Sequence, residues 1–149
     1  MKIQSRGLQI IKEFESLKLK PYLCPAGIPT IGYGSTYYED GTKVTLNDLP
    51  ITEQRADELL ANISDKFSIQ VSKLLKVELN QNQFDALVSF SFNIGIGNLT
   101  TSTILKRINE KDFENASLEF AKWNKSGGKV LNGLIKRREK ESQLFTLNI

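Results

Sequence analysis

Three groups that could do chemistry lie close together in the sequence: the carboxyl group of Glu15, the thiol of Cys24 and the hydroxyl of Thr30. Prolines and glycines lie between these residues and just after them, and both residue types bend a chain. A bent chain can bring three different polar groups around a single cleft. We therefore interpret residues 15–34 as the segment that holds the active site.

The composition excludes most alternative chemistries. The chain has no histidine, which rules out Ser-His and Cys-His nucleophilic catalysis, histidine metal sites and histidine proton shuttles. Its single cysteine cannot form an intrachain disulfide or a Cys-rich zinc site. Acid–base catalysis must therefore use Asp, Glu, Lys, Tyr or the thiol, and we expect no metal and no cofactor.

The elements that must position these groups can be predicted from residue patterns. The chain has 149 residues, 40% of them apolar and 25% charged, which suits one ordinary globular domain. An apolar stripe from Ile3 to Phe14 predicts a helix that is capped by Ser5 and ends close to Glu15. Residues 16–50 hold all four prolines and predict a small, twisted antiparallel sheet. Its strands are expected around 30–33, 35–38 and 42–45.

Helices are expected after the predicted sheet. Thr52 should cap a long helix that reaches residue 75, and Asn80 with Gln83 predicts a capping pair for an apolar central helix. The segment Asn93-Ile-Gly-Ile-Gly-Asn98 should break that helix. Shorter helices are expected near 101–109, 112–123 and 132–146. The predicted fold class is therefore α+β and mostly helical, with a small antiparallel sheet near the N-terminus.

The spacing of the three groups resembles that of a known family. Glu15, then Cys24 nine positions on and Thr30 six further, followed at once by Ile-Gly-Tyr-Gly, is similar to the phage-type lysozymes of glycoside hydrolase family 24, the T-even endolysin type. Cys24 stands where the best-known members have Asp, a variant that the family also uses. Ser35 stands where many members have His. Later segments that also resemble the family are Gln83-Phe-Asp-Ala-Leu-Val-Ser-Phe-Ser-Phe-Asn-Ile-Gly95, Trp123-Asn-Lys-Ser-Gly-Gly128 and Gly133-Leu-Ile-Lys-Arg-Arg-Glu139.

The resemblance implies one lysozyme domain over residues 1–149 with a lysozyme-like fold. Its parts would be a β lobe over 16–50, a linking helix over 52–75, and a helical lobe made of 1–15 plus 77–149. It also implies an endolysin, an inverting muramidase that lyses the host cell. Such an enzyme hydrolyses the β-1,4 bond between N-acetylmuramic acid and N-acetylglucosamine in bacterial peptidoglycan. Glu15 would act as the acid, while Cys24 and Thr30 would hold a water across the sugar.

Cys24 raises a physical question, because a free thiol has a pKa of about 8.5 and is mostly neutral at pH 7. Either Lys18 or Lys20 lowers the pKa of this thiol, or Cys24 mainly orients the water together with Thr30. Further residues are expected to bind substrate, although a structural role suits the five in the helical part equally well. They are Gly32, Tyr33 and Gly34 on the sheet side, and Asn93, Thr101, Ser102, Trp123 and Asn132 in the helical part.

Three other functions compete with hydrolysis. A lytic transglycosylase also needs one catalytic Glu, whereas a non-catalytic peptidoglycan-binding protein would not need to retain Glu15 and Thr30. A basic nucleic-acid binder could use Lys136-Arg-Arg138, but Glu139 and Glu141 interrupt that run, so we expect no nucleic-acid partner.

The expected partner is instead the glycan strand of peptidoglycan, bound by a monomer. No signal-peptide core fits the N-terminus and no apolar run approaches a membrane span, so no stable membrane insertion is expected. The protein should therefore stay in the host cytoplasm until a holin permeabilises the membrane. It would then reach the periplasm and the cell wall.

Overall fold

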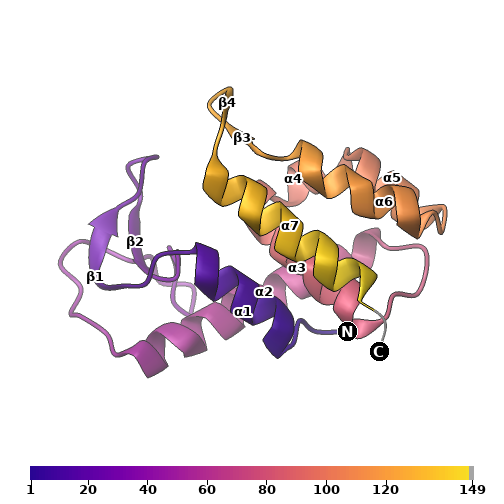
Figure 1. Ribbon diagram of the computed structural model, residues 1–149. Coiled ribbons are helices and arrows are strands. Elements are labelled where there is room, and N and C mark those ends of the chain that lie inside the picture. Colours follow the sequence, from indigo (N-terminus) through magenta and orange to yellow (C-terminus); the bar gives the residue numbers. More distant parts are fainter. Residues whose placement is uncertain (148–149) are drawn as a thin grey trace. The chain divides into compact units, whose positions relative to one another are not determined.

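The computed structural model describes residues 1–147, and the chain forms two compact units (Figure 1). Unit 1 contains Met1–Phe14 and the chain from Lys66 onward, and unit 2 contains Glu15–Asp65. Within residues 1–147, no helix combines the length and the apolar character that crossing a membrane requires.

Helix α3 (Gln81–Ile94) is the centre of unit 1, because most of its surface is buried. Helices α1 (Ser5–Phe14) and α7 (Asn132–Thr146) pack against it. The predicted capping pair at its start is confirmed. The Asn80 side chain accepts a hydrogen bond from the Gln83 N–H at 2.8 Å, and the Gln83 side chain accepts one from the Asn80 N–H at 2.9 Å.

Helix α1 is capped by a residue from another helix rather than by its own sequence. Ser5, the predicted cap, is instead the first helical residue. The carboxylate of Asp85 on α3 accepts hydrogen bonds from the Gln4 N–H at 3.0 Å and the Gly7 N–H at 3.2 Å. Asp85 is 1% exposed, and the Gln81 side chain donates to it at 2.6 Å. An acidic group at a helix N-terminus accepts hydrogen bonds from N–H groups that have no partner within the helix. Its negative charge also interacts favourably with the positive end of the helix dipole.

A buried charge cluster joins α7 to α3. The carboxylate of Glu141 accepts a hydrogen bond from Ser89 at 2.6 Å and lies 2.7 Å from the Nε atom of Arg138. Arg137 approaches the same carboxylate at 3.3 Å, and the Arg138 guanidinium also lies over the Phe90 ring. Each of the three charged side chains is at most 2% exposed. A buried charge needs such partners, because the loss of its hydration is costly.

The chain between α3 and α7 contains elements that periodicity did not predict. Helix α4 (Ile96–Thr100) begins inside the expected break, directly after Gly95. Helices α5 (Thr103–Asn109) and α6 (Phe113–Glu119), with the 3-10 turn η1 (Phe120–Lys122), occupy the two expected short-helix regions. A hairpin of strands β3 (Lys125–Ser126) and β4 (Lys129–Val130) then precedes α7 (Figure 1). Its turn residues Gly127 and Gly128 both have positive φ, the conformation that a two-residue hairpin favours.

Unit 2 contains an antiparallel pair of strands, β1 (Lys18–Leu23) and β2 (Pro29–Gly32). Strand β1 was not predicted, and the strands expected at 35–38 and 42–45 are reduced to two isolated bridges, one between Ile31 and Ser35 and one between Tyr37 and Lys43. Two-stranded sheets depend on packing by neighbouring elements. The core of unit 2 supplies it through Ile31, Val44 and Leu59, with Tyr38 and Ile51 packed alongside.

Helix α2 (Glu53–Leu74) starts in unit 2 and continues into unit 1. Its predicted cap is confirmed, because the Thr52 hydroxyl accepts a hydrogen bond from the Arg55 N–H at 3.1 Å. The predicted end at residue 75 is one residue beyond the observed end. The α+β, mostly helical class with a small antiparallel sheet is therefore confirmed, while the proposed division into two lobes and a linking helix stays a prediction.

Candidate active site

Glu15 is the first residue after α1 and is half-buried. Its carboxylate lies beside the segment after Thr30, because a Cβ atom built on Gly34 would be 3.9 Å from Glu15 Oε2. Gly34 has φ +99°, a backbone conformation that favours glycine. Two parts of unit 2 that are nearly twenty positions apart in sequence thus approach each other at this carboxylate.

Cys24 and Thr30 are held by the hairpin of β1 and β2. The Cys24 N–H donates to the Ile28 carbonyl at 3.1 Å, and the Gly27 N–H donates to the Cys24 carbonyl at 2.8 Å. Gly27 has φ +76°, so a glycine suits this turn. The turn returns the chain within a few residues, which places Thr30 on β2 opposite Tyr22 on β1. The family resemblance led us to expect Cys24 and Thr30 on the same side of the sugar, and the turn of this hairpin brings the two residues near each other.

The surroundings of Cys24 favour its thiolate. The backbone amide groups of Ile28 and Ala26 and the hydroxyl of Thr30 lower the pKa of the Cys24 thiol, although partial burial opposes them. Hydrogen bonds to an anion favour the charged form. Lys18 and Lys20, the two lysines considered from the sequence, are not among the groups that lower this pKa. Stabilisation comes instead from the turn of the hairpin.

Thr30 is 3% exposed, and its Oγ1 donates a hydrogen bond to the Ile28 carbonyl at 2.8 Å. The same hydroxyl interacts with the Cys24 thiol. A hydroxyl carries one proton, so it can donate to the carbonyl or to a thiolate, but not to both at once. A proton that can turn between two acceptors couples the charge of Cys24 to the orientation of Thr30.

The other predicted residues of unit 2 differ in accessibility. Gly32 is buried against α2, because a Cβ atom there would lie 3.5 Å from Ala56, and it has φ +69°. Tyr33 is 6% exposed, so its side chain belongs mainly to the core. Gly34 is half-buried and lies beside Glu15. Gly34 is thus the residue of the three with the best opportunity to contact a ligand.

In unit 1 the structure brings two of the five predicted residues together. Asn93 and Trp123 line a pocket of about 330 Å³. The other residues that line the pocket were not identified from the sequence. They are Ile94, Asn98, Lys125, Ser126, Leu131 and Leu134. Of these, Asn98 lies on α4, and Lys125 and Ser126 form β3, two elements that were not predicted. Carboxamides beside an aromatic ring suit a polar ligand such as a sugar.

Thr101, Ser102 and Asn132 are not among the residues that line this pocket. Ser102 has a structural task, because its hydroxyl accepts from the Leu105 N–H at 3.2 Å and donates to the Leu99 carbonyl at 2.7 Å. It therefore caps α5. Thr101 comes directly after α4, and Asn132 begins α7, and both are exposed.

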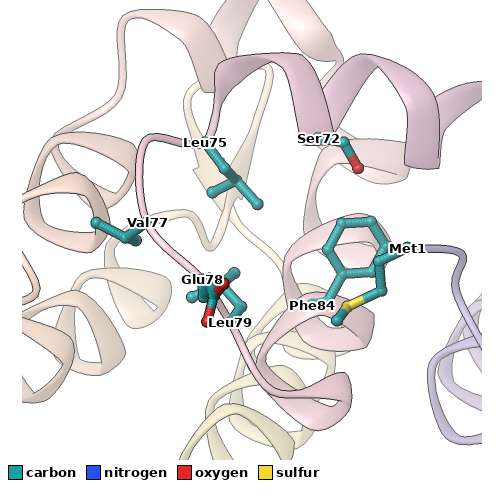
Figure 2. Close-up of a pocket in the computed structure, with 7 residues that line it drawn as sticks. All are labelled: Met1, Ser72, Leu75, Val77, Glu78, Leu79 and Phe84. Carbon is teal, nitrogen blue, oxygen red and sulfur yellow. The ribbon is translucent and has the colours of Figure 1, made fainter.

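A more apolar pocket of about 370 Å³ lies elsewhere in unit 1, near the end of α2 (Figure 2). Its lining includes Met1, Leu75, Val77, Leu79 and Phe84, with only Ser72 and Glu78 supplying polar side-chain atoms. None of the predicted site residues lines it. Among residues 1–147, no group of three or more Cys, Asp or Glu side chains is arranged to hold a metal ion.

Comparison with known proteins gives consistent relatives. The family model described as phage lysozyme matches residues 12–141. The chain is 47% identical over 150 residues to the endolysin of Bacillus phage B103, a match that covers 97% of this chain but 54% of that protein. The chain thus spans about half the length of this relative. It is 43% identical over 149 residues to the endolysin of Acyrthosiphon pisum secondary endosymbiont phage 1, covering 97% and 98% of the two chains.

Solved structures agree with these sequence matches. An endolysin from Escherichia coli O157:H7 phage FAHEc1 superposes with a TM-score of 0.86 at 39% identity. The match covers 98% of this chain and 94% of that chain. The lysozyme-like fold that the sequence resemblance implies is therefore confirmed.

Proposed function

The chain belongs to the phage lysozyme family, and from this premise we propose that it is an endolysin that hydrolyses the glycan of bacterial peptidoglycan. The bond would be the β-1,4 linkage between N-acetylmuramic acid and N-acetylglucosamine. The observation that carries the proposal is the arrangement of unit 2. There the Cys24 thiol and the Thr30 hydroxyl interact across one hairpin, and the Glu15 carboxylate lies beside Gly34.

The three side chains divide the chemistry between them. Glu15 delivers a proton to the leaving oxygen of the glycosidic bond, a contribution of about 10²–10⁴-fold for general acid catalysis. Cys24 and Thr30 hold the attacking water. The Thr30 hydroxyl accepts a hydrogen bond from the water, and the thiolate of Cys24 takes up the proton that the water loses. Water adds to the anomeric carbon as the bond to the leaving oxygen breaks.

We propose an inverting mechanism, in which water attacks the face of the sugar opposite the leaving group. Such a site needs about 6.5–9.5 Å between its two groups to accommodate that water. The placement in glycoside hydrolase family 24, the T-even endolysin type, rests on the spacing of Glu15, Cys24 and Thr30. Measurement of the anomer first released, by NMR, tests inversion directly.

Substrate contacts beyond the three groups remain proposals of the same kind. Gly34 would line the site in unit 2, with Gly32 and Tyr33 supporting its backbone. Asn93 and Trp123 would bind sugar in the pocket of unit 1, whose size and lining suit that ligand. Thr101, Ser102 and Asn132 have less support, because they are absent from that lining and Ser102 caps a helix.

The partner would be the glycan strand, bound by a monomer without nucleic acid. We propose that the enzyme waits in the host cytoplasm and that a holin gives it access to the periplasm and the cell wall. Expression of the chain alone, with and without a holin, tests this route. Lysis that needs no holin would refute it.

Analysis of the products distinguishes hydrolysis from the other enzymatic activity considered, that of a lytic transglycosylase. Purified protein is incubated with isolated peptidoglycan, and the new glycan ends are identified by mass spectrometry. Hydrolysis yields free reducing ends, whereas a lytic transglycosylase yields anhydro-muramic ends. A non-catalytic binder would yield neither while still sedimenting with the polymer.

A further inference from the structure

A tyrosine shares the hairpin face that carries Cys24 and Thr30. Tyr22 on β1 pairs directly with Thr30 on β2. Side chains of directly paired residues project from the same face of a sheet, and residues two apart along a strand do so as well. Cys24 lies two positions after Tyr22, and its N–H extends the strand pairing by donating to the Ile28 carbonyl. Tyr22, Cys24 and Thr30 therefore face the same side of the hairpin.

Glu15 also acts electrostatically on this tyrosine. Burial raises the pKa of the Tyr22 phenol, and the negative charges of Cys24 and then Glu15 raise it further. The phenol thus responds to both of the groups that the proposed mechanism requires. A pKa raised above the ordinary value of a phenol keeps Tyr22 protonated at neutral pH, where its hydroxyl is a neutral hydrogen-bond donor.

The hydroxyl of Tyr22 has no hydrogen-bond partner among residues 1–147, and the side chain is half-buried. Tyr38 in the same unit shows the contrasting case of a structural tyrosine. Its hydroxyl donates to Asp48 at 2.6 Å, and its ring packs on the core of Ile31, Val44 and Leu59. Tyr22 shows neither of these two contacts.

We propose that Tyr22 is a substrate-binding residue, whose hydroxyl donates a hydrogen bond to an oxygen of the glycan held between Glu15 and the Cys24–Thr30 pair. The inference rests on the proposed function, because it names a further contact of the same site. A half-buried phenol offers a ring for packing against the sugar and a donor to fix its orientation. Tyr22 was not identified from the sequence, because β1 itself was not predicted.

The test compares Tyr22→Phe with wild type on solubilised peptidoglycan. Loss of one hydrogen bond to a neutral group should lower kcat/KM by about three- to tenfold, with the melting temperature unchanged. Tyr37→Phe is the matched control, because Tyr37 lies in the same unit and is 50% exposed. It should retain full activity. Tyr22→Leu, which also loses the ring, should lose more activity than Tyr22→Phe.

Three results would overturn the inference: full activity of Tyr22→Phe, equal losses in Tyr22→Phe and Tyr37→Phe, or a loss that parallels a fall in melting temperature. Failure of the proposed function has a different signature. Wild type would then release no glycan ends, whereas failure of the inference alone leaves wild type active and Glu15→Gln inactive.

Discussion

Asp85 provides the most direct quantitative test of how α1 is anchored, and α1 is the helix whose last turn leads into Glu15. We predict that Asp85→Ala lowers the free energy of unfolding by about 2–4 kcal/mol. This range is the sum of the costs of losing the two hydrogen bonds that the carboxylate accepts from backbone N–H groups. Gln4 is exposed, so its N–H can form a hydrogen bond with water when Asp85 is removed. Loss of this hydrogen bond should therefore cost as much as loss of an ordinary N-cap, about 1 kcal/mol.

The Gly7 N–H has no such alternative, because Gly7 is buried. A buried donor left without an acceptor costs about 1–3 kcal/mol. Asp85→Asn keeps one side-chain oxygen as an acceptor but loses the charge, so it should cost less than Asp85→Ala. The Gln81 amide, which donates to Asp85 at 2.6 Å, also loses a charged partner in both variants.

Urea denaturation followed by circular dichroism measures these differences, provided that the slope of the transition is unchanged. The matched control is Asp112→Ala, because Asp112 caps α6 through a longer hydrogen bond of 3.4 Å to the Asn115 N–H in an exposed setting. It should cost less than Asp85→Ala. A loss below about 1 kcal/mol for Asp85→Ala, or equal losses for the two variants, would refute the reasoning from burial.

Three further predictions concern titratable groups. If the Cys24 thiolate is the base, Cys24→Asp should move the alkaline limb of the pH–rate profile to lower pH; superimposable limbs would leave Cys24 as a neutral group that orients water. Glu141→Gln should lower the free energy of unfolding by about 3–5 kcal/mol in urea melts, because Arg138, which is 1% exposed, loses its charged partner; an unchanged melt would contradict this. The hydrogen bond from Tyr38 holds the pKa of Asp48 below its usual 3.8, so the stability it adds is present above that pH and is lost as the pH falls through the lower folded pKa. Stabilities of wild type and Tyr38→Phe should therefore differ at pH 7 and converge in acid, and a pH-independent difference would exclude the linkage.

Local sequence signals predicted the elements whose stabilising contacts are also local. The capping side chains of Thr52 and Asn80 accept hydrogen bonds from N–H groups three residues later in the sequence. The residues that mark the starts of α2 and α3 can therefore be recognised from the neighbouring sequence alone. The cap of α1 could not be found this way, because Asp85 lies some eighty positions from Gln4. Ser5 satisfied the local pattern, but a tertiary contact took its place.

Strand β1 was missed for a related reason. Its residues are mostly exposed and include Pro21, so they lack the alternation that marks a half-buried strand. Pairing with β2 creates this strand, and pairing is not visible in β1 alone. The same hairpin explains why the sequence indicated that Cys24 and Thr30 act together but did not indicate which groups lower the pKa of the Cys24 thiol. Backbone amides at a turn leave no signature in residue types, whereas the lysines that were considered do.

The short helix α4 escaped prediction because five residues are too few to show a helical period. Gly95, which has φ +89°, lies in the segment that was expected to break α3 and directly follows its last residue. A glycine that ends one helix carries no information on whether another helix begins directly after it. The pocket lined by Asn93 and Trp123 depends on the hairpin after η1, so its full lining could be known only from the structure.

Clearing of isolated peptidoglycan by purified protein tests the central claim most directly, with Glu15→Gln as the comparison. Gln is close to Glu in size and cannot deliver the carboxyl proton, so the variant should fold as wild type does. The proposal predicts steady clearing by wild type and a rate for Glu15→Gln lower by at least about 10²-fold. Equal clearing rates for the two proteins would show that Glu15 is not the acid and that the active site assigned to residues 15–34 is wrong.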